Sequence, residues 1–221
     1  MSGSFTIGLI EVLAYLFPGG LVLASILYGY DSDLGRRTLT ETSYQVLFIA
    51  CAYITGHLIT LFSFVLVKLR ALVKKVVKAK TIEEELFFYE PLLKKLHMLF
   101  GVRAAGNTEG KRKSERDQAY LFSSRLITDN SLPASQVVDR LYALTVFSRN
   151  TSFAFGVAAV LLLTRHGNVA ASCGILAACF FLRYAQMERN LTHTVFRAAY
   201  VYLSTKRQSE EQKPSGSKIV G

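Results

Sequence analysis

Cysteine is scarce in this chain, and the sequence motifs of common enzyme classes are missing. The three cysteines, Cys51, Cys173 and Cys179, all lie inside apolar stretches, which is typical of small buried hydrophobic residues and not of disulfide partners or metal ligands. The chain has no P-loop, no GxGxxG, HExxH or GxSxG motif and no pair of CxxC motifs. We therefore expect no metal site and no cofactor, and the sequence offers no support for an enzyme.

The N-terminus lacks the basic residues that begin a secretory signal. The first ten residues contain no Lys or Arg, and Glu11 interrupts the apolar stretch that follows. A secretory signal has a basic start and then an uncharged apolar run. The sequence therefore predicts that the first apolar stretch is retained as a membrane span.

Apolar residues make up 51% of the sequence, and they gather in stretches separated by charged ones. The stretch 43–67 contains no formally charged residue, and as a helix it would reach about 37 Å, enough to cross a hydrocarbon core of ~30 Å. Further spans are predicted at about 7–30, 150–164 and 169–182. The last two are short, which implies local thinning of the bilayer or shielding by neighbouring subunits. We expect an all-α membrane protein with four transmembrane helices arranged as two hairpins.

Positive charge is distributed very unevenly along the chain. The net charge of +10 would suit either a nucleic acid or anionic lipid headgroups. Of the 26 Lys and Arg residues, 23 fall in 68–149 and 183–221, and the positive-inside rule places these segments in the cytoplasm. The sequence therefore predicts contact with the lipid bilayer, cytoplasmic termini and no nucleic-acid partner. The triplet at Asn150 matches a glycosylation acceptor, but on the cytoplasmic side it should be inert.

The polar parts of the chain have different expected structures. The stretch 101–117 lacks apolar periodicity and predicts a mobile loop. Pro133 follows capping residues, so a long helix is predicted to begin there and run into the third span. The fourth span is predicted to run antiparallel to it, and at equal distance from the hairpin turn Arg149 would approach Glu188. The expected segments are an N-terminal transmembrane hairpin (1–67), a basic helical cytoplasmic region (68–149), a C-terminal transmembrane hairpin (150–182), a cytoplasmic helical extension (183–207) and a disordered tail (208–221).

Basic and apolar residues are segregated directly after the second span. Over 68–80, Leu and Val fall on one face of a helix and the basic residues on the other. Helices of this kind lie against anionic headgroups; the alternative is a solvated helix packed on its own cytoplasmic domain. Two further arginines flank the last two spans at matching distances from the hairpin. The expected headgroup contacts are Lys68, Arg70, Lys74, Lys75, Lys78, Arg149 and Arg183.

Two ionisable residues and a helix break lie inside the first two spans. Glu11 and His57 are candidates because ionisable groups within a span are often functional. The break is at Pro18, which precedes Gly19 and Gly20 and frees the carbonyl of residue 14. His57 is expected at the same depth and is predicted to donate a hydrogen bond to that carbonyl; the other hypothesis is a polar pocket for an ion, a proton or a lipid group. Glu11 is expected at the interface, with an intramembrane acid as the alternative.

Small residues recur at four-residue steps in the last two spans. They are Ala154 and Ala158 in the third span, and Ala170, Gly174 and Ala178 in the fourth. Small side chains at this spacing let helices in lipid approach closely. Closure of the hairpin on itself and a contact between copies in a homo-oligomer explain the pattern equally well.

In layout alone, the chain resembles small multi-span bacterial proteins that act as membrane subunits of larger assemblies, including some stress and phage-defence systems. This resemblance implies a bacterial inner membrane. The leading hypothesis is a non-enzymatic multi-pass subunit that presents cytoplasmic helices to a protein partner and senses or perturbs the bilayer, with a homo-oligomer as one form. The alternatives are a small channel or transporter that uses the broken first span and His57, and an intramembrane lipid-modifying enzyme.

Overall fold

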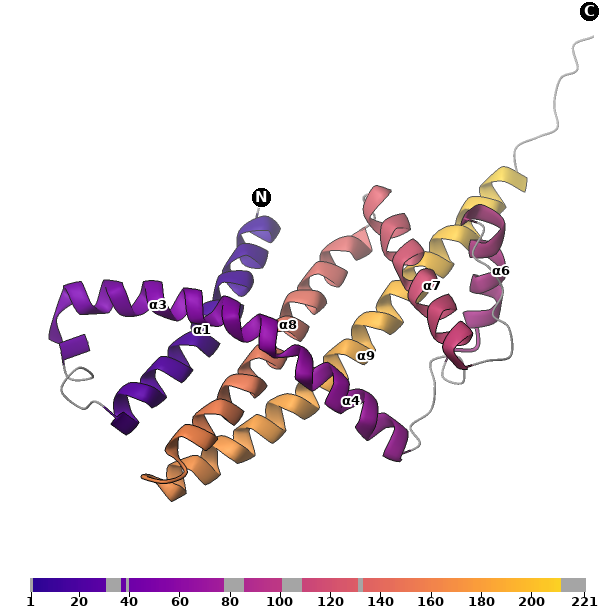
Figure 1. Cartoon of the computed structure of the whole chain (residues 1–221). Helices are drawn as coiled ribbons and strands as arrows, with labels where there is room; N and C mark the ends of the chain where they lie inside the picture. The colour runs from indigo at the N-terminus through magenta and orange to yellow at the C-terminus, as the bar shows by residue number, and fades with distance from the viewer. Residues whose placement is uncertain are drawn as a thin grey trace, which may run out of the picture. The chain divides into compact units, whose positions relative to one another are not determined.

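The computed structural model consists of α-helices joined by short connections over its described residues (Figure 1). The described residues are 2–30, 37–38, 40–77, 86–100, 109–130 and 133–211. The predicted all-α class is confirmed. The helices are α1 (Ser2–Tyr30), α3 (Thr42–Phe62), α4 (Phe64–Val77), α6 (Tyr89–Phe100), α7 (Glu109–Asp129), α8 (Pro133–Leu162) and α9 (Gly167–Glu211).

Four stretches of helix are long and apolar enough to cross a membrane, judged by length and composition. They are Val12–Gly29, Thr42–Val73, Pro133–Leu162 and Gly167–Lys206. Each overlaps one of the spans predicted from the sequence. The architecture is therefore that expected of a multi-pass helical membrane protein.

The chain divides into two compact units. The first unit comprises Met1–Ala79 and Asp139–Asn190, and the second comprises Lys80–Val138 and Leu191–Gly221. The first unit thus contains α1, α3, α4 and the turn between α8 and α9. The second contains α6 and α7 together with the outer ends of α8 and α9.

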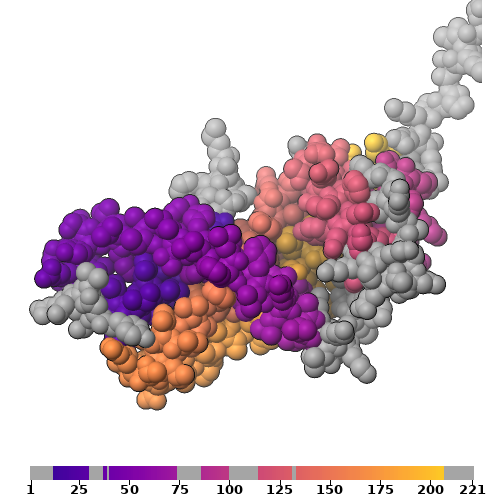
Figure 2. Space-filling model, in the orientation of Figure 1, coloured from indigo at the N-terminus to yellow at the C-terminus, as the bar shows by residue number. Residues whose placement is uncertain are grey.

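Within the first unit, α1 and α3 form an antiparallel pair. In Figure 2, α3 and α4 form one continuous surface, and α1 is visible only between α3 and the α8–α9 pair. The predicted span 43–67 is not one unbroken helix, because α3 ends at Phe62 and α4 begins at Phe64. The backbone N–H of Ser63 donates to the carbonyl of Ile59 at 2.8 Å, which closes α3 at this point.

The second predicted hairpin is confirmed as the pair α8 and α9. Helix α8 begins at Pro133, as predicted, since the first turn of a helix needs no donor from its backbone nitrogen. The turn is closed by the N–H groups of Arg165 and His166, which donate to the carbonyl of Leu162 at 3.2 and 2.8 Å. The Arg165 guanidinium donates to the carbonyl of Gly29 at 2.6 Å, so this turn lies beside the end of α1.

The second unit has an apolar core of its own. Helix α6 buries Leu92 and Leu96 completely, and both pack in one cluster with Phe196 of α9. The ring of Tyr89 meets that of Phe196 edge to face, with centroids 5.4 Å apart. The Tyr202 hydroxyl also donates to the Asn130 side chain at 2.6 Å and links α9 to the end of α7. This unit therefore folds around large apolar side chains.

Two polar segments are more helical than the sequence predicted. Helix α7 includes 109–117, which were assigned to the predicted mobile loop, while 101–108 lie outside the described residues. The segment is rich in Glu, Lys and Arg, which favour helix even where no apolar stripe marks it. Helix α9 likewise continues to Glu211, beyond the predicted start of a disordered tail at 208, and 212–221 lie outside the described residues.

Candidate functional site in the first unit

The predicted break at Pro18 is absent from the described helix α1, which runs from Ser2 to Tyr30 without interruption. The carbonyl that Pro18 leaves without a helical donor is met by a residue of α8 and not by the histidine that the sequence suggested. Pro18 lies inside α1, so the carbonyl of Ala14 loses its usual helical donor. The side-chain amide of Asn150 donates to this carbonyl at 3.3 Å. The prediction that His57 supplies this hydrogen bond is therefore wrong: among the described contacts, the Ala14 carbonyl receives its donor from Asn150.

Asn150 is the centre of a buried polar cluster that joins three helices. Its side chain is fully buried, and its amide nitrogen donates to the Thr60 hydroxyl at 2.8 Å. Its amide oxygen accepts from the Ser63 hydroxyl at 3.0 Å. An amide in an apolar environment is tolerated only when its polar atoms are hydrogen-bonded. The cluster thus connects the carbonyl freed by Pro18 in α1 with the junction between α3 and α4.

Sequence reasoning missed the role of Asn150. The residue was noted only as part of a glycosylation triplet expected to be inert, although an amide within an apolar helix is itself a signal for an interhelical hydrogen bond. What the sequence could not supply is the register that brings Asn150 to Ala14 and Ser63.

His57 lies at an aromatic contact on the exposed side of α3. Its ring stacks on Tyr15 with centroids 4.1 Å apart, and it meets Tyr53 edge to face at 4.6 Å. In the described structure the His57 side chain is exposed. Glu11 belongs to α1, but its side chain lies outside the described residues.

Glycines allow α1 and α3 to approach to backbone contact. A Cβ added at Gly19 would lie 1.8 Å from the carbonyl oxygen of Ala52, and one added at Gly56 would lie 1.9 Å from that of Tyr15. No side chain fits at either position. Gly20 is different, since its added Cβ would meet the nearest side-chain carbons at an ordinary 3.8 Å. In the structure, Gly19 serves helix packing.

An ion pair lies where α4 meets α9. The Arg70 guanidinium is bonded to the Glu188 carboxylate, and it also lies 5.7 Å from the centre of the Tyr184 ring. Arg70 is buried, although the sequence placed it among the residues that meet lipid headgroups. Its pairing with Glu188 was not anticipated, because helix spacing had matched Glu188 with Arg149. The burial of Arg70 reflects the contact of α4 with α9, which no local pattern reports.

The other basic residues of the predicted headgroup set have separate environments. Arg149 places its guanidinium 4.9 Å from the centre of the Phe64 ring, and among the described residues its buried Nε atom finds no hydrogen-bond partner. Lys68 and Arg183 are exposed. The side chains of Lys74 and Lys75 lie outside the described residues, as does all of Lys78.

The small residues of the last two spans divide between two roles. Ala154, Ala158 and Ala170 are buried in contacts within the first unit. Gly174 and Ala178 are exposed, and an added Cβ at Gly174 would meet nothing within 4 Å. Ala158 and Ala170 therefore close the hairpin, Ala154 packs α8 against Val22 of α1 and Ile59 of α3, and the last two residues are left on the surface.

The described side chains do not form a cluster that would hold a metal ion: no group of three or more His, Cys, Asp and Glu residues is close enough among them. Cys51, Cys173 and Cys179 are all free thiols. Comparison with known proteins finds no family model that matches this chain, and no similar curated protein or solved structure.

Proposed function

We propose that the protein is a non-enzymatic membrane subunit whose second unit binds a protein partner in the cytoplasm. The cytoplasmic position of this unit follows from the 23 of 26 basic residues that flank the spans in 68–149 and 183–221. In this proposal the protein is a multi-pass protein of a bacterial inner membrane. The basic residues after the second span contact anionic headgroups and couple the partner to the state of the bilayer.

The observation that carries this proposal is an apolar surface on α6. Phe87 and Met98 are 92% and 79% exposed, whereas Leu92 and Leu96 on the opposite side fill the core of the second unit. Pro91 and Lys94 are also exposed. Of these four exposed positions, 91, 94 and 98 recur at steps of three or four and thus share one side of α6, and Phe87 lies in the turn directly before the helix. We refer to them as the α6 patch.

A surface of this composition suits a protein partner. Large apolar side chains exposed in a unit that already has a filled core are unfavourable in water unless another molecule covers them. Phe and Met are enriched at protein interfaces, and the single charge of Lys94 within the α6 patch would favour an acidic residue on the partner.

Site-specific photo-crosslinking tests the proposal in the full-length protein in membranes of the source organism. A photoreactive amino acid replaces Phe87 or Met98, and a matched control replaces Gln118, an exposed polar residue of α7 in the same unit. We expect a discrete protein adduct at 87 and 98 but not at 118. The adduct should disappear when Lys94→Glu is added, because the partner's acidic residue would then be repelled.

Other outcomes would overturn the proposal. Adducts of 87 and 98 with lipid alone would make the α6 patch a membrane contact. Ion flux through the purified protein in liposomes would favour the channel hypothesis, and turnover of a lipid headgroup would favour the enzyme hypothesis. The channel hypothesis depends on a polar pocket at His57, whose ring stacks on Tyr15.

A further inference from the structure

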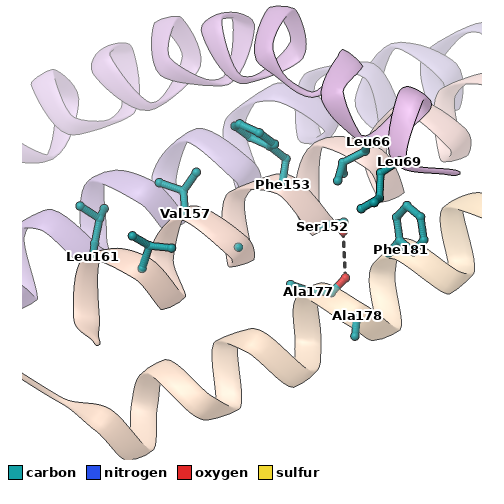
Figure 3. A pocket seen from close by; sticks show the side chains of 11 residues that line it. Leu66, Leu69, Ser152, Phe153, Val157, Leu161, Ala177, Ala178 and Phe181 are labelled. Carbon is teal, nitrogen blue, oxygen red and sulfur yellow. Dashed lines mark hydrogen bonds between the residues drawn. The ribbon is translucent and has the colours of Figure 1, made fainter. Parts of the chain in front are cut away.

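The first unit has an apolar groove that needs no specific partner. The groove has a volume of about 560 Å³ and lies between α4, α8 and α9 (Figure 3). It is open at Gly156, where an added Cβ would meet nothing within 4 Å. Among the described residues that line it, Ser152 has the one polar side chain, and its hydroxyl already donates to the carbonyl of Ala177 at 2.8 Å. Hydrocarbon therefore satisfies this groove.

The outer face of α3 is different, because it carries a polar residue among apolar ones. Five exposed residues of this helix recur at alternating steps of three and four, and they are Leu47, Ala50, Ile54, His57 and Leu61. We refer to them as the α3 stripe. The residues that α3 buries lie on the other side of the helix, and they are Ala52, Gly56 and Ile59. The α3 stripe therefore faces away from the rest of the first unit.

The spacing of the α3 stripe suits a second, identical stripe. Residues at alternating steps of three and four give the 3.5-residue repeat along which two helices pack over several turns. In a two-fold dimer, the same surface of both copies forms the contact. When the two-fold axis is perpendicular to the membrane, equivalent residues of the two copies also lie at the same depth. The stripes then meet in register, and the small side chain of Ala50 lets the helices approach closely.

His57 lacks a hydrogen-bond partner within the described part of the chain. The residue lies at the midpoint of the apolar stretch Thr42–Val73. Its ring makes a stacked contact with Tyr15 and an edge contact with Tyr53, and among the described residues its nitrogen atoms make no hydrogen bond. Lipid tails offer neither donors nor acceptors, so an unpaired imidazole at this depth is unfavourable. A partner that covers the α3 stripe therefore has to bring a polar group to His57.

A second copy of the chain brings that polar group by symmetry. A neutral imidazole has one donor nitrogen and one acceptor nitrogen, so two rings at the same depth can share an N–H···N hydrogen bond. We propose that two copies of this chain associate through the α3 stripe, with a hydrogen bond between their His57 rings. A polar pair of this kind also fixes the register of the two helices. This contact goes beyond the proposed function, because it belongs to the first unit and the α6 patch to the second.

Disulfide cross-linking of the full-length chain in membranes of the source organism tests this contact. Cys51 and Cys179, which are exposed, are first replaced by alanine, and the buried Cys173 is retained. Ile54→Cys then places a thiol in the α3 stripe, and Ile49→Cys is the matched control outside it. The two isoleucines are 61% and 55% exposed, so the variants differ in the side of α3 that they occupy and not in exposure. A disulfide forms only where the Cα atoms of two cysteines come within about 7 Å.

We expect oxidation to link Ile54→Cys into dimers and to leave Ile49→Cys monomeric. For purified Ile54→Cys in lipid vesicles, adding His57→Phe should raise the mole fraction of protein at which half of the chains are linked by about three- to tenfold, the scale of one interhelical hydrogen bond in lipid. His57→Phe keeps a ring against Tyr15, so it should separate the copies without unfolding them. His57→Gln, which keeps a donor and an acceptor, should restore association.

Several results would overturn the proposal. Equal linking at 54 and 49 would mean that the chains meet by random collision. A disulfide adduct of position 54 with a different protein, in place of the dimer, would give the α3 stripe another occupant. Association that His57→Phe leaves unchanged, or that His57→Gln weakens as much as His57→Phe does, would mean that no hydrogen bond at this position joins the copies.

Discussion

The first unit combines close backbone approach and buried hydrogen bonds with apolar clusters, whereas the second is held together mainly by large apolar side chains. In the first unit, Gly19 and Gly56 bring two helices to backbone contact, and Asn150 bonds to α1, α3 and the α3–α4 junction. In the second unit, Leu96 and Phe196 are buried in a single core cluster.

This difference follows from the solvent that each unit would meet. Burial of Leu or Phe drives folding in water, because apolar surface leaves the solvent. Lipid tails are as apolar as these side chains, so helices in a bilayer associate through tight packing of small residues and through interhelical hydrogen bonds. The contrast therefore supports a bilayer around the first unit and water around the second.

The largest effect is expected at Gly19. Gly19→Ala places a Cβ 1.8 Å from the Ala52 carbonyl oxygen, so α1 and α3 must separate. We expect the free energy of unfolding to fall by more than about 4 kcal/mol, which is exceptional for a point mutation. The measurement is unfolding of the purified protein by SDS, followed by circular dichroism. Gly20→Ala is the control and should be nearly neutral, because its Cβ meets only ordinary contacts. A stable Gly19→Ala protein would disprove the backbone approach.

The second unit should respond to loss of apolar volume. Leu96→Ala removes a fully buried side chain, and we expect a loss of about 2–5 kcal/mol in the local stability of this unit. Hydrogen exchange of the α6 and α7 amides measures it. Leu99→Ala, at a position that is 56% exposed, should change protection by less than about 0.5 kcal/mol. Equal effects of the two substitutions would contradict the assigned core.

The smallest of these effects is expected for the polar cluster. Asn150→Ala removes three side-chain hydrogen bonds. At about 0.6 kcal/mol for each such bond in a membrane protein, the free energy of unfolding should fall by about 2 kcal/mol. His57→Phe should change stability by less than about 0.5 kcal/mol, because a phenyl ring can keep the contact with Tyr15. Both are measured by unfolding in SDS. A larger loss from His57→Phe than from Asn150→Ala would restore the histidine to the role first predicted for it.

The arrangement of helices was largely predictable. The charge-free stretch 43–67, the turn around 164–168 and the start of a helix at Pro133 are local signals, and each lies where the structure has the corresponding feature. The break at Ser63 was not predicted, because serine is common within spans and its effect depends on the partner that it meets. The helix over 109–117 was missed because apolar periodicity was taken as the main signal for helix.

The candidate site was less predictable. Pro18 and Gly19 were predicted to interrupt the first span, but α1 runs through both residues, because the donor that Pro18 lacks is supplied by Asn150 of α8. The partners assigned to Glu188 and to the Ala14 carbonyl were deduced from equal depth in the membrane. Depth leaves the rotation of each helix open, and that rotation turns His57 outward and Asn150 inward.

The sequence alone determined which stretches are apolar, how positive charge is divided between their ends and where the long helices begin, because hydropathy and charge are sums over neighbouring residues. Only the tertiary structure decided that Asn150 meets Ala14, 136 positions away, and Ser63, 87 positions away. It also decided that Arg70 is buried against Glu188 and that a groove opens beside Gly156. These contacts depend on the relative rotation and register of separate helices, which no property of one segment specifies.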